Sequence, residues 1–224
     1  MYRERPSRVP GGFVWSSVYD GDQVRVLPDG CIDLLWDGIA VSIAGPDTHA
    51  QLYVGEPGST MTGLRFAPGD APRVLGVPAE DLTDQRVPLD AVWDPVRVRR
   101  FTDAVAAAPR PGTALETLAL ACRADPDEHS ALIDAVVQLA RGGCTSTTIA
   151  DRIGLSARQL QRRSVAAFGY GTKTLGRILR MQEALTLIRR GEGLADSAAR
   201  SGYADQSHLA REVKDLAGVT ITQL

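Results

Sequence analysis

The sequence is poor in the residues that build disulfide frameworks, metal centres and membrane spans. It has only three cysteines, Cys31, Cys122 and Cys144, and three histidines in 224 residues. An odd number of widely spaced cysteines predicts neither a disulfide framework nor a zinc site, and it fits a reducing cytoplasm. No apolar run approaches the roughly 20 residues that cross a bilayer, and the charged N-terminus lacks the apolar stretch of a secretory signal. We therefore expect a cytoplasmic protein with no membrane partner.

The motifs of cofactor-dependent and nucleophilic enzymes are also missing. The chain contains no P-loop, no dinucleotide-binding fingerprint and no evident pairing of a nucleophile with a base. Cupin-type metal sites need two or three histidines beside a carboxylate, whereas the first 130 residues contain only His49 and His129. We therefore expect no cofactor, no metal and no enzymatic activity. Cys31 follows a turn and leaves two interpretations open, a redox sensor or the commoner buried free thiol.

The formal net charge of −2 hides an asymmetry along the chain. Residues 131–224 contain 13 Lys and Arg against 8 Asp and Glu, a net charge of +5. The whole chain has 25 and 27 of these residues, which leaves 12 basic and 19 acidic residues before position 131, a net charge of −7. A basic part joined to an acidic part indicates that only the C-terminal part meets a polyanion.

Residues 1–92 are predicted to form a β-rich domain. Short apolar or alternating segments are separated at close intervals by Gly, Pro and Asp, which is the pattern of an antiparallel barrel or sandwich. Pro28, Asp29 and Gly30 have the chemistry of a tight turn, since Pro presets φ and Gly supplies a positive φ. A short helix is expected over residues 78–82, where a proline and two acids suit a first turn.

Residues 93–127 are predicted to be helices that connect two domains. Apolar residues recur at helical spacing on either side of the Pro-Arg-Pro-Gly break at 109–112. The polar, Pro-containing segment 124–129 is the expected domain boundary, and residues 128–224 are expected to be all-helical. The sequence thus predicts an α+β protein of two domains, an antiparallel β domain followed by an all-α domain.

The last hundred residues contain an internal repeat. Segments 156–162 and 205–211 lie 49 positions apart, and each has a helix N-cap residue, a Leu four positions later and an Arg two positions after that. Upstream of each segment, an Ala followed four positions later by Gly lets two helices approach and ends the first one. The pattern predicts tandem helix-turn-helix units. The matched residues are Ala150, Gly154, Ser156, Leu160 and Arg162, then Ala198, Gly202, Asp205, Leu209 and Arg211.

The segment between the two units is predicted to be one helix over residues 172–190, because its apolar residues keep helical spacing. At about 1.5 Å per residue, 19 residues span about 28 Å, close to the roughly 34 Å of one DNA turn. A rigid spacer of that length would let both recognition helices enter successive major grooves on one face of the duplex.

These features resemble the DNA-binding domain of AraC/XylS-type transcriptional regulators. The family pattern has the same two units, a connecting helix with residues matched here by Arg180 and Ala184, and a stretch that residues 202–208 match almost intact. The resemblance covers about residues 133–224 and implies a sequence-specific regulator that binds double-stranded DNA. The chain departs from the usual aromatic, apolar and proline residues of the pattern at Ser164, Ser197, Val213 and Ile221.

The resemblance and the exposed positions of the two recognition helices predict the DNA contacts. Arg pairs bidentately with guanine and Gln with adenine, so both residue types suit base readout. Phosphates are contacted by cations, hydroxyls and helix N-termini. Leu160 and Leu209 are expected to face the core. The expected base-reading residues are Arg158, Gln161, Arg162, Gln206, Ser207, His208 and Arg211, and the expected backbone contacts are Ser156, Arg163, Lys173, Arg177 and Lys214.

A β-rich domain before such a unit resembles the family's cupin-like regulatory domain, which binds an effector or mediates dimerisation. A small-molecule effector is therefore expected in the mouth of the β domain, with candidate contacts Trp15, Trp36, Tyr53, Arg65 and Phe66. Each aromatic alone is more often a core or surface residue, and Arg65 in an apolar strand needs a carboxylate or an anion. RNA polymerase and a second copy of the chain stay open as partners.

The alternative function is that of an enzyme or a ligand-sequestering protein that acts through the β domain. An activated cysteine or a cluster of metal ligands would favour it.

Overall fold

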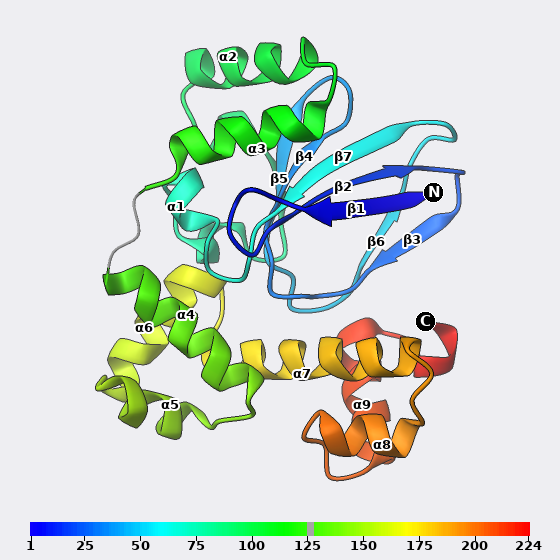
Figure 1. The fold of residues 1–224 in the computed structure, drawn as a ribbon, viewed down its shortest axis with the longest axis vertical. Coiled ribbons are helices and arrows are strands. Elements are labelled where there is room, and N and C mark those ends of the chain that lie inside the picture. Colours follow the sequence, from blue (N-terminus) through cyan, green and yellow to red (C-terminus); the bar gives the residue numbers. More distant parts are fainter. Residues whose placement is uncertain (125–127) are drawn as a thin grey trace.

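The computed structural model describes residues 1–124 and 128–224, without the side chains of residues 128 and 129. Figure 1 shows a β-rich N-terminal part, two helices stacked against it, and an all-helical C-terminal part. This arrangement confirms the predicted α+β fold, with an antiparallel β region followed by a helical region. The boundary predicted at residues 124–129 lies mostly outside the described residues.

The β-rich part contains an antiparallel sheet of six strands and a separate ribbon of two strands. The large sheet runs in the order β1-β2-β7-β4-β5-β8, and the ribbon pairs β3 with β6. Among the described strands, the two sheets form an open sandwich and not a closed barrel. The strands are β1 (Tyr2–Pro6), β2 (Phe13–Val18), β3 (Gln23–Val26), β4 (Asp33–Trp36), β5 (Val41–Ala44), β6 (Gln51–Val54), β7 (Thr60–Arg65) and β8 (Arg86–Pro88).

Alternating side chains place one face of the large sheet in the core. In β5, Val41 and Ile43 are buried and their neighbours are more exposed, as expected for a half-buried strand. Gly63 in β7 is required by packing, because a Cβ there would lie 2.2 Å from the ring of Trp15. The sequence pattern did not predict β1 and β8. β1 is a fully exposed, charged edge strand and β8 has three residues, so neither carries an apolar period.

The segment predicted as connecting helices covers the sheet. α2 (Pro95–Ala106) and α3 (Pro111–Cys122) are joined to β2 and β7 through α3, and Phe101, Val105 and Leu115 belong to the same hydrophobic core as the strands. These two helices therefore complete the β-rich part. Three short helices lie nearby: α1 (Pro72–Leu75), η1 (Ala79–Leu82), which is the helix expected at 78–82 in 3-10 form, and η2 (Leu89–Ala91).

The helical part has a core of its own. Its long helix was predicted over residues 172–190 and is observed with its end one residue earlier. No helix in the described part of the chain is long and apolar enough to cross a membrane. The helices are α4 (Glu128–Arg141), α5 (Ser146–Ile153), α6 (Ala157–Phe168), α7 (Thr172–Arg189), α8 (Leu194–Arg200), α9 (Gln206–Ala217) and η3 (Ile221–Gln223).

The long helix α7 is contacted by every neighbouring unit. α4 packs against it on one side, and α8 and α9 pack against it on another. The β-rich part reaches it as well: Gln182 Nε2 donates to the carbonyl of Pro28 at 2.7 Å, and the Leu175 side chain lies against Gly30. α7 is therefore the common support of the helical part and its link to the sheets.

The β-rich part also binds the C-terminal ends of α6 and α9. Thr83 Oγ1 donates to the carbonyl of Gly169, directly after α6, at 3.2 Å. The backbone N–H of Ala50 donates to the carbonyl of Leu216, in the last turn of α9, at 2.7 Å. The last carbonyls of a helix have no partner within it, so these bonds satisfy acceptors that would otherwise face water.

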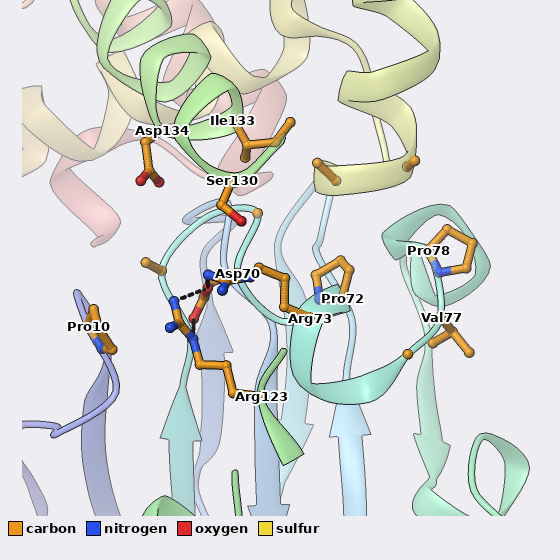
Figure 2. Close-up of a pocket in the computed structure, with 15 residues that line it drawn as sticks. Pro10, Asp70, Pro72, Arg73, Val77, Pro78, Arg123, Ser130, Ile133 and Asp134 are labelled. Carbon is orange, nitrogen blue, oxygen red and sulfur yellow. Dashed lines mark hydrogen bonds and ion pairs between the residues drawn. The ribbon is translucent and has the colours of Figure 1, made fainter. Parts of the chain in front are cut away.

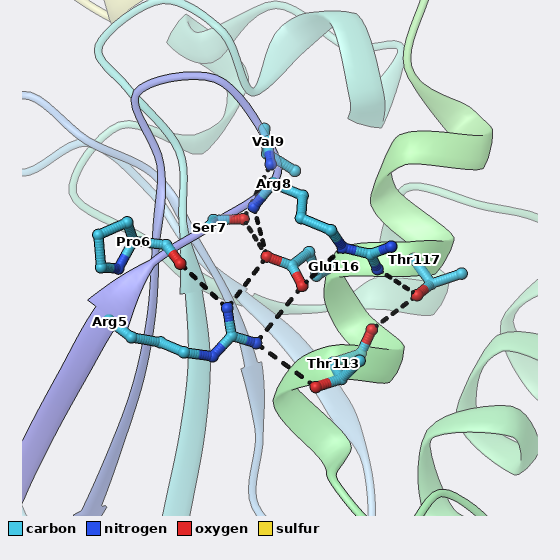
Figure 3. Close-up of polar contacts among 8 residues, drawn as sticks. All are labelled: Arg5, Pro6, Ser7, Arg8, Val9, Thr113, Glu116 and Thr117. Carbon is cyan, nitrogen blue, oxygen red and sulfur yellow. Dashed lines mark hydrogen bonds and ion pairs between the residues drawn. The ribbon is translucent and has the colours of Figure 1, made fainter.

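A buried carboxylate fastens the N-terminal segment to α3 (Figure 3). Glu116 is 1% exposed and accepts hydrogen bonds from the guanidinium groups of Arg5 and Arg8, from the backbone N–H of Arg8, and from Ser7 Oγ at 2.8 Å. Burial alone would raise the pKa of this carboxyl, but the bonds from Arg5, Arg8 and Ser7 outweigh burial and lower the pKa to about 2. Glu116 is therefore ionised and holds β1 and the following turn in place.

Replacing Glu116 by Gln keeps the side-chain shape and removes the charge. We expect the free energy of unfolding at pH 7 to fall by about 1–3 kcal/mol, because hydrogen bonds to a charged group are lost. The folded-state pKa is depressed, so this contribution is complete above pH 4.5 and disappears as pH falls from 4.5 towards 2. Urea denaturation at pH 7 and pH 3 measures it, and an equal difference between the two proteins at both pH values would contradict the role of the charge.

Candidate DNA-binding interface and ligand cavity

The first predicted helix-turn-helix unit is formed by α5 and α6. Gly154 ends α5 in the left-handed conformation at φ 69°, and the Ser156 side chain accepts a bond from the N–H of Gln159 at the start of α6. The Gln159 side chain in turn accepts a bond from the backbone N–H of Ser156, which completes a capping box. Ala150 and Leu160 are buried, as the repeat predicts. The local sequence thus fixes where α6 begins and which face it presents.

The second unit, α8 and α9, follows the same design. Gly202 has φ 76°, and Asp205 Oδ1 accepts a bond from the N–H of His208 at 2.7 Å. Ala198 and Leu209 have no exposed surface. The predicted equivalence of the two units is therefore confirmed at the turn glycine, the N-cap, the small residue and the core leucine.

Most of the predicted base-reading residues lie exposed on the N-terminal turns of α6 and α9. Among them, Gln161 lies against the backbone at Gly171, where a Cβ would approach its Oε1 to 2.6 Å. His208 is half-buried, with its ring edge-on to Tyr203 at a centroid distance of 5.3 Å. The exposed ones are Arg158, Gln161 and Arg162 on α6 and Gln206, Ser207 and Arg211 on α9.

The predicted backbone contacts differ in how free their groups are. Lys173 and Lys214 are exposed and Arg163 is partly exposed, whereas the Ser156 hydroxyl is used in the capping box. The Arg177 guanidinium forms two hydrogen bonds with Glu212, at 2.8 and 3.2 Å, which join α7 to α9. The hydrogen bonds to Glu212 raise the pKa of Arg177 above its usual value. Arg177 therefore holds α9 against α7.

Two of the departures from the family pattern leave buried hydroxyls without partners. Ser164 in α6 and Ser197 in α8 have no exposed surface, and neither hydroxyl forms a hydrogen bond. Val213 fills its position in the core of α9, and Ile221 begins the 3-10 helix η3. The core of both units tolerates these residues without losing the helix-turn-helix geometry.

In the β-rich part, a cavity of about 240 Å³ lies between the β3–β6 ribbon and the large sheet. Tyr53 and Arg65, two of the predicted effector contacts, line it together with several aspartates. The predicted need of Arg65 for a carboxylate is met by Asp29 at 3.3 Å and Asp33 at 3.7 Å. Sequence reasoning did not identify these aspartates as partners of Arg65, because Asp29 lies in a segment with turn chemistry and Asp33 is the first residue of the apolar strand β4.

The other three predicted effector contacts do not line this cavity. Trp15 Nε1 donates to Asp33 at 2.6 Å and supports its wall from behind. Trp36 and Phe66 are 6% and 0% exposed and belong to the hydrophobic core. Trp36 and Phe66 pack instead in the core that the large sheet shares with α2 and α3, away from this cavity, so the structure does not support them as effector contacts.

Burial governs the titratable groups of the cavity. It raises the pKa of Asp33 to about 6 against the opposing charge of Arg65, and with help from the charges of Asp84 and Asp29 it raises the pKa of Asp47 to about 7. Burial also raises the pKa of the Cys31 thiol. A thiol held in its protonated form is a poor nucleophile, which favours the inert free-thiol interpretation of Cys31 over a redox sensor.

A second crevice, of about 390 Å³, lies where the β-rich part meets α4 and α6 (Figure 2). Asp70 forms ion pairs there with Arg73 at 3.1 Å and with Arg123 at 2.7 Å. Arg73 also donates to the carbonyl of Ala124. These charged groups are satisfied by one another, and they brace the end of α3 beside the start of the helical part.

Comparison with known proteins agrees with the geometry of the helical part. Residues 149–224 match a family model described as a helix-turn-helix domain, and residues 13–88 match a domain of unknown function (DUF6597). No curated protein matches the chain.

Several solved structures resemble the chain at low identity. The C-terminal domain of AraT, a response regulator from Geobacillus stearothermophilus, is 21% identical with a TM-score of 0.39 and covers 43% of this chain and 85% of its own. ToxT from Vibrio cholerae O395 is 11% identical, with a TM-score of 0.46 and coverages of 99% and 96%. ToxT from strain SCE256 with bound unsaturated fatty acid is 13% identical, with a TM-score of 0.49 and coverages of 95% and 93%.

The family model and the capped, repeated units together define a tandem helix-turn-helix DNA-binding protein. Residues 149–224 form an AraC/XylS-type domain, in which α6 and α9 are the second helices of the two units and α7 lies between the units.

Replacing Arg177 by Met removes the guanidinium but keeps an unbranched apolar stem. We expect the free energy of unfolding to fall by about 3–5 kcal/mol, because Glu212 is left buried without its partner. The double variant Arg177→Met with Glu212→Gln should recover most of this loss. Lys173→Met is the exposed control on the same helix and should change stability by less than about 0.5 kcal/mol. Equal stability of Arg177→Met and Lys173→Met would contradict the structural role of Arg177.

Proposed function

We propose that the protein is a sequence-specific transcriptional regulator that reads DNA with α6 and α9. The observation that carries this proposal is the matched presentation of the two helices. Each starts at a side-chain cap, buries a leucine on its fourth position, and exposes Gln and Arg side chains around that leucine. Base readout needs such side chains on a helix of fixed orientation.

The proposed base contacts follow from exposure and donor geometry. Arg158 and Arg162 on α6 and Arg211 on α9 are suited to guanine, and Gln161 and Gln206 are suited to adenine. Ser207 and His208 complete the second set. Lys173, Lys214 and Arg163 supply phosphate contacts, and Ser156 places the N-terminus of α6 towards the backbone. Arg177 supports these contacts only indirectly, because it holds α9 through its hydrogen bonds to Glu212.

α7 gives the two helices one common frame. Its 18 residues span about 27 Å at about 1.5 Å per residue, somewhat less than the roughly 34 Å of one DNA turn. Since both units pack on α7, a single chain can present two reading helices to neighbouring major grooves.

We further propose that a small-molecule effector bound in the β-rich part controls this reading. The ribbon wall of the 240 Å³ cavity includes Gln51 and Leu52, and the adjacent Ala50 holds the end of α9. A ligand that shifts the ribbon would therefore move α9 relative to α6. RNA polymerase and a second copy of the chain are the proposed protein partners of such a regulator. The alternative of a β-domain enzyme is not favoured by Cys31, whose thiol stays protonated.

Replacing Arg162 by Ala should weaken binding to the preferred site by about 1–3 kcal/mol and relax the preference at one base position. The preferred site is first obtained by selecting bound sequences from random DNA. Arg99→Ala, an exposed arginine on α2, is the matched control and should leave affinity unchanged. A chain that selects no common sequence would overturn the regulator proposal, and an equal loss on specific and random duplexes would assign Arg162 to the backbone.

Salt dependence separates phosphate contacts from structural cations. Log affinity should fall linearly with log salt, and Lys173→Met should reduce that slope by about one charge equivalent. The double variant Arg177→Met with Glu212→Gln should leave the slope unchanged, because it removes two charges that already neutralise each other. Filter binding or fluorescence anisotropy at several salt concentrations measures both slopes. A reduced slope for the double variant would restore Arg177 to the phosphate contacts.

A further inference from the structure

A groove of about 390 Å³ lies between the exposed edge strand β1 and the start of α3. It opens on the sheet face that α3 covers, whereas the 240 Å³ cavity lies on the other face, beside the ribbon. Strand register places the side chains, because directly paired residues share a face. Arg3 pairs with Ser16 and Arg5 with Val14, and Val14 belongs to the core under α3. β1 therefore turns two arginines towards the first turn of α3.

The close approach of α3 to β2 gives the groove its floor. Gly112, in the first turn of α3, is buried, and a Cβ there would lie 2.4 Å from Val14 Cγ1. The helix can approach the strand this closely only because residue 112 has no side chain. Arg110, directly before α3, lines the groove from the helix side. Strand and helix thus bring arginines from both ends of the N-terminal part into one space.

The one acidic residue that lines the groove is engaged elsewhere. Glu4 pairs with Trp15, so its side chain lies on the other face of the sheet. There its carboxylate accepts a hydrogen bond from the Tyr2 hydroxyl at 2.6 Å and lies 4.0 Å from Arg65. The charged lining residues are Arg3, Glu4, Arg5 and Arg110.

Arg5 is bonded to Glu116, but that carboxylate is shared with a second arginine. Figure 3 shows the guanidinium groups of Arg5 and Arg8 both directed at Glu116. The distances to its oxygens are 3.3 Å from Arg5 Nη1 and 3.0 Å from Arg8 Nε. With Arg8 and Glu116 included, and Glu4 counted in full, four guanidinium groups accompany two carboxylates. The groove and its direct partners therefore have an excess of two positive charges.

Two of the arginines have no acidic partner. Arg110 is exposed, and its side chain forms no hydrogen bond or ion pair with any residue that the structure describes. Arg3 donates only to Met1 Sδ, at 3.4 Å, and a thioether is a weak acceptor. The hydroxyls of Ser16 and Thr62 line the same groove, also without a partner in the described part of the chain. The groove thus offers several free N–H and O–H donors around one space.

We propose that this groove binds the phosphate group of a small molecule. A phosphate monoester carries a charge of about −1.5 to −2 at pH 7, which matches the excess of two positive charges. Guanidinium groups bind phosphate oxygens through two parallel N–H bonds, and hydroxyls add further donors. The volume of about 390 Å³ lies within the roughly 300–1,000 Å³ of ligand sites, so an organic group fits beside the phosphate. The site is separate from the proposed effector cavity and does not depend on the proposed function.

The test measures ligand binding by the full-length chain in the absence of DNA. Isothermal titration calorimetry at pH 8, in a phosphate-free buffer of low salt, compares glucose 6-phosphate, glucuronate and glucose. These ligands share a sugar ring and carry about two, one and no negative charges. We expect glucose 6-phosphate to bind most tightly and to raise Tm, and glucose to give no heat. Equal binding of glucuronate and glucose 6-phosphate would overturn the proposal.

Inorganic phosphate identifies the source of the phosphate group. We expect it to bind more weakly than glucose 6-phosphate, because the groove also has room for an organic group. Binding as tight as that of glucose 6-phosphate would assign the site to free phosphate and overturn the organic part of the proposal. Neither heat nor a rise in Tm with both ligands at millimolar concentration would overturn it entirely.

Variants locate the site. Arg3→Met and Arg110→Met should each weaken the binding of glucose 6-phosphate by about fivefold or more, because a charge-assisted hydrogen bond is lost. Neither should lower Tm, since neither arginine has an acidic partner. Arg99→Met, at an exposed position of α2 outside the groove, is the matched control and should bind as the parent chain does. An equal loss in Arg99→Met, or unchanged affinity when both groove arginines are replaced, would overturn the proposal.

The proposed DNA partner also carries phosphates, and one measurement separates it from a small molecule. The double variant Arg3→Met with Arg110→Met should keep the affinity of the parent chain for random duplex DNA, because both residues belong to the β-rich part. A loss of that affinity would make the groove a DNA contact and overturn the small-molecule proposal. Binding of glucose 6-phosphate by a chain that selects no common DNA sequence would keep this site and overturn the regulator.

Discussion

The packing of α7 is the constraint on which the rest of the molecule depends. This single helix contributes buried side chains along its whole length, from Leu175 to Leu187, and both helix-turn-helix units are built against it. The distance between the two recognition helices is therefore set by backbone hydrogen bonds within one helix and not by a flexible linker. The Arg177–Glu212 pair adds a polar contact that joins the N-terminal third of α7 to the middle of α9. Arg177, which the sequence suggests as a phosphate contact, is thus paired with Glu212 and joins two helices that expose other basic residues.

A second constraint comes from the C-terminal carbonyls of α6 and α9. Helix ends leave their last carbonyls without partners, and the β-rich part provides donors at both places: Thr83 after α6 and Ala50 in the last turn of α9. Arg25, in the ribbon, adds a third bond to the carbonyl of Ala217 at 2.9 Å. The acidic part thus contacts the basic part at the helix ends opposite to the N-terminal turns that expose the arginines. These contacts leave the proposed reading surface uncovered.

The sequence predicted those features that depend only on neighbouring residues. They are the N-caps Ser156 and Asp205, the positive φ of Gly154 and Gly202, and the apolar period of α7. What sequence could not predict depends on distant partners. β1 has no apolar period because it is an exposed edge strand. α3 looks like a connecting helix in the sequence, although it packs on β2 and β7. The cavity aspartates lie far apart in the sequence, and only the fold brings them together. The core position of Trp36 and Phe66 could not be predicted for the same reason, since an aromatic residue type alone does not distinguish a core position from a cavity wall.

The cavity between the ribbon and the large sheet lies between segments that are bonded to α6 and to α9. Its walls include the ribbon, whose ends hold α9, and the segments around Asp47 and Asp84, beside which Thr83 holds the end of α6. Carboxylates that face one another across a low-dielectric space repel, so the spacing of these walls depends on the ion pairs that Arg65 forms with Asp29 and Asp33. The walls are bonded to the C-terminal ends of α6 and α9, and both helices also pack against α7. The β-rich part and α7 together therefore place the two helices. Under the proposed function, an effector in the β-rich part acts through these bonds, since a ligand shifts an equilibrium only by its differential affinity for two states.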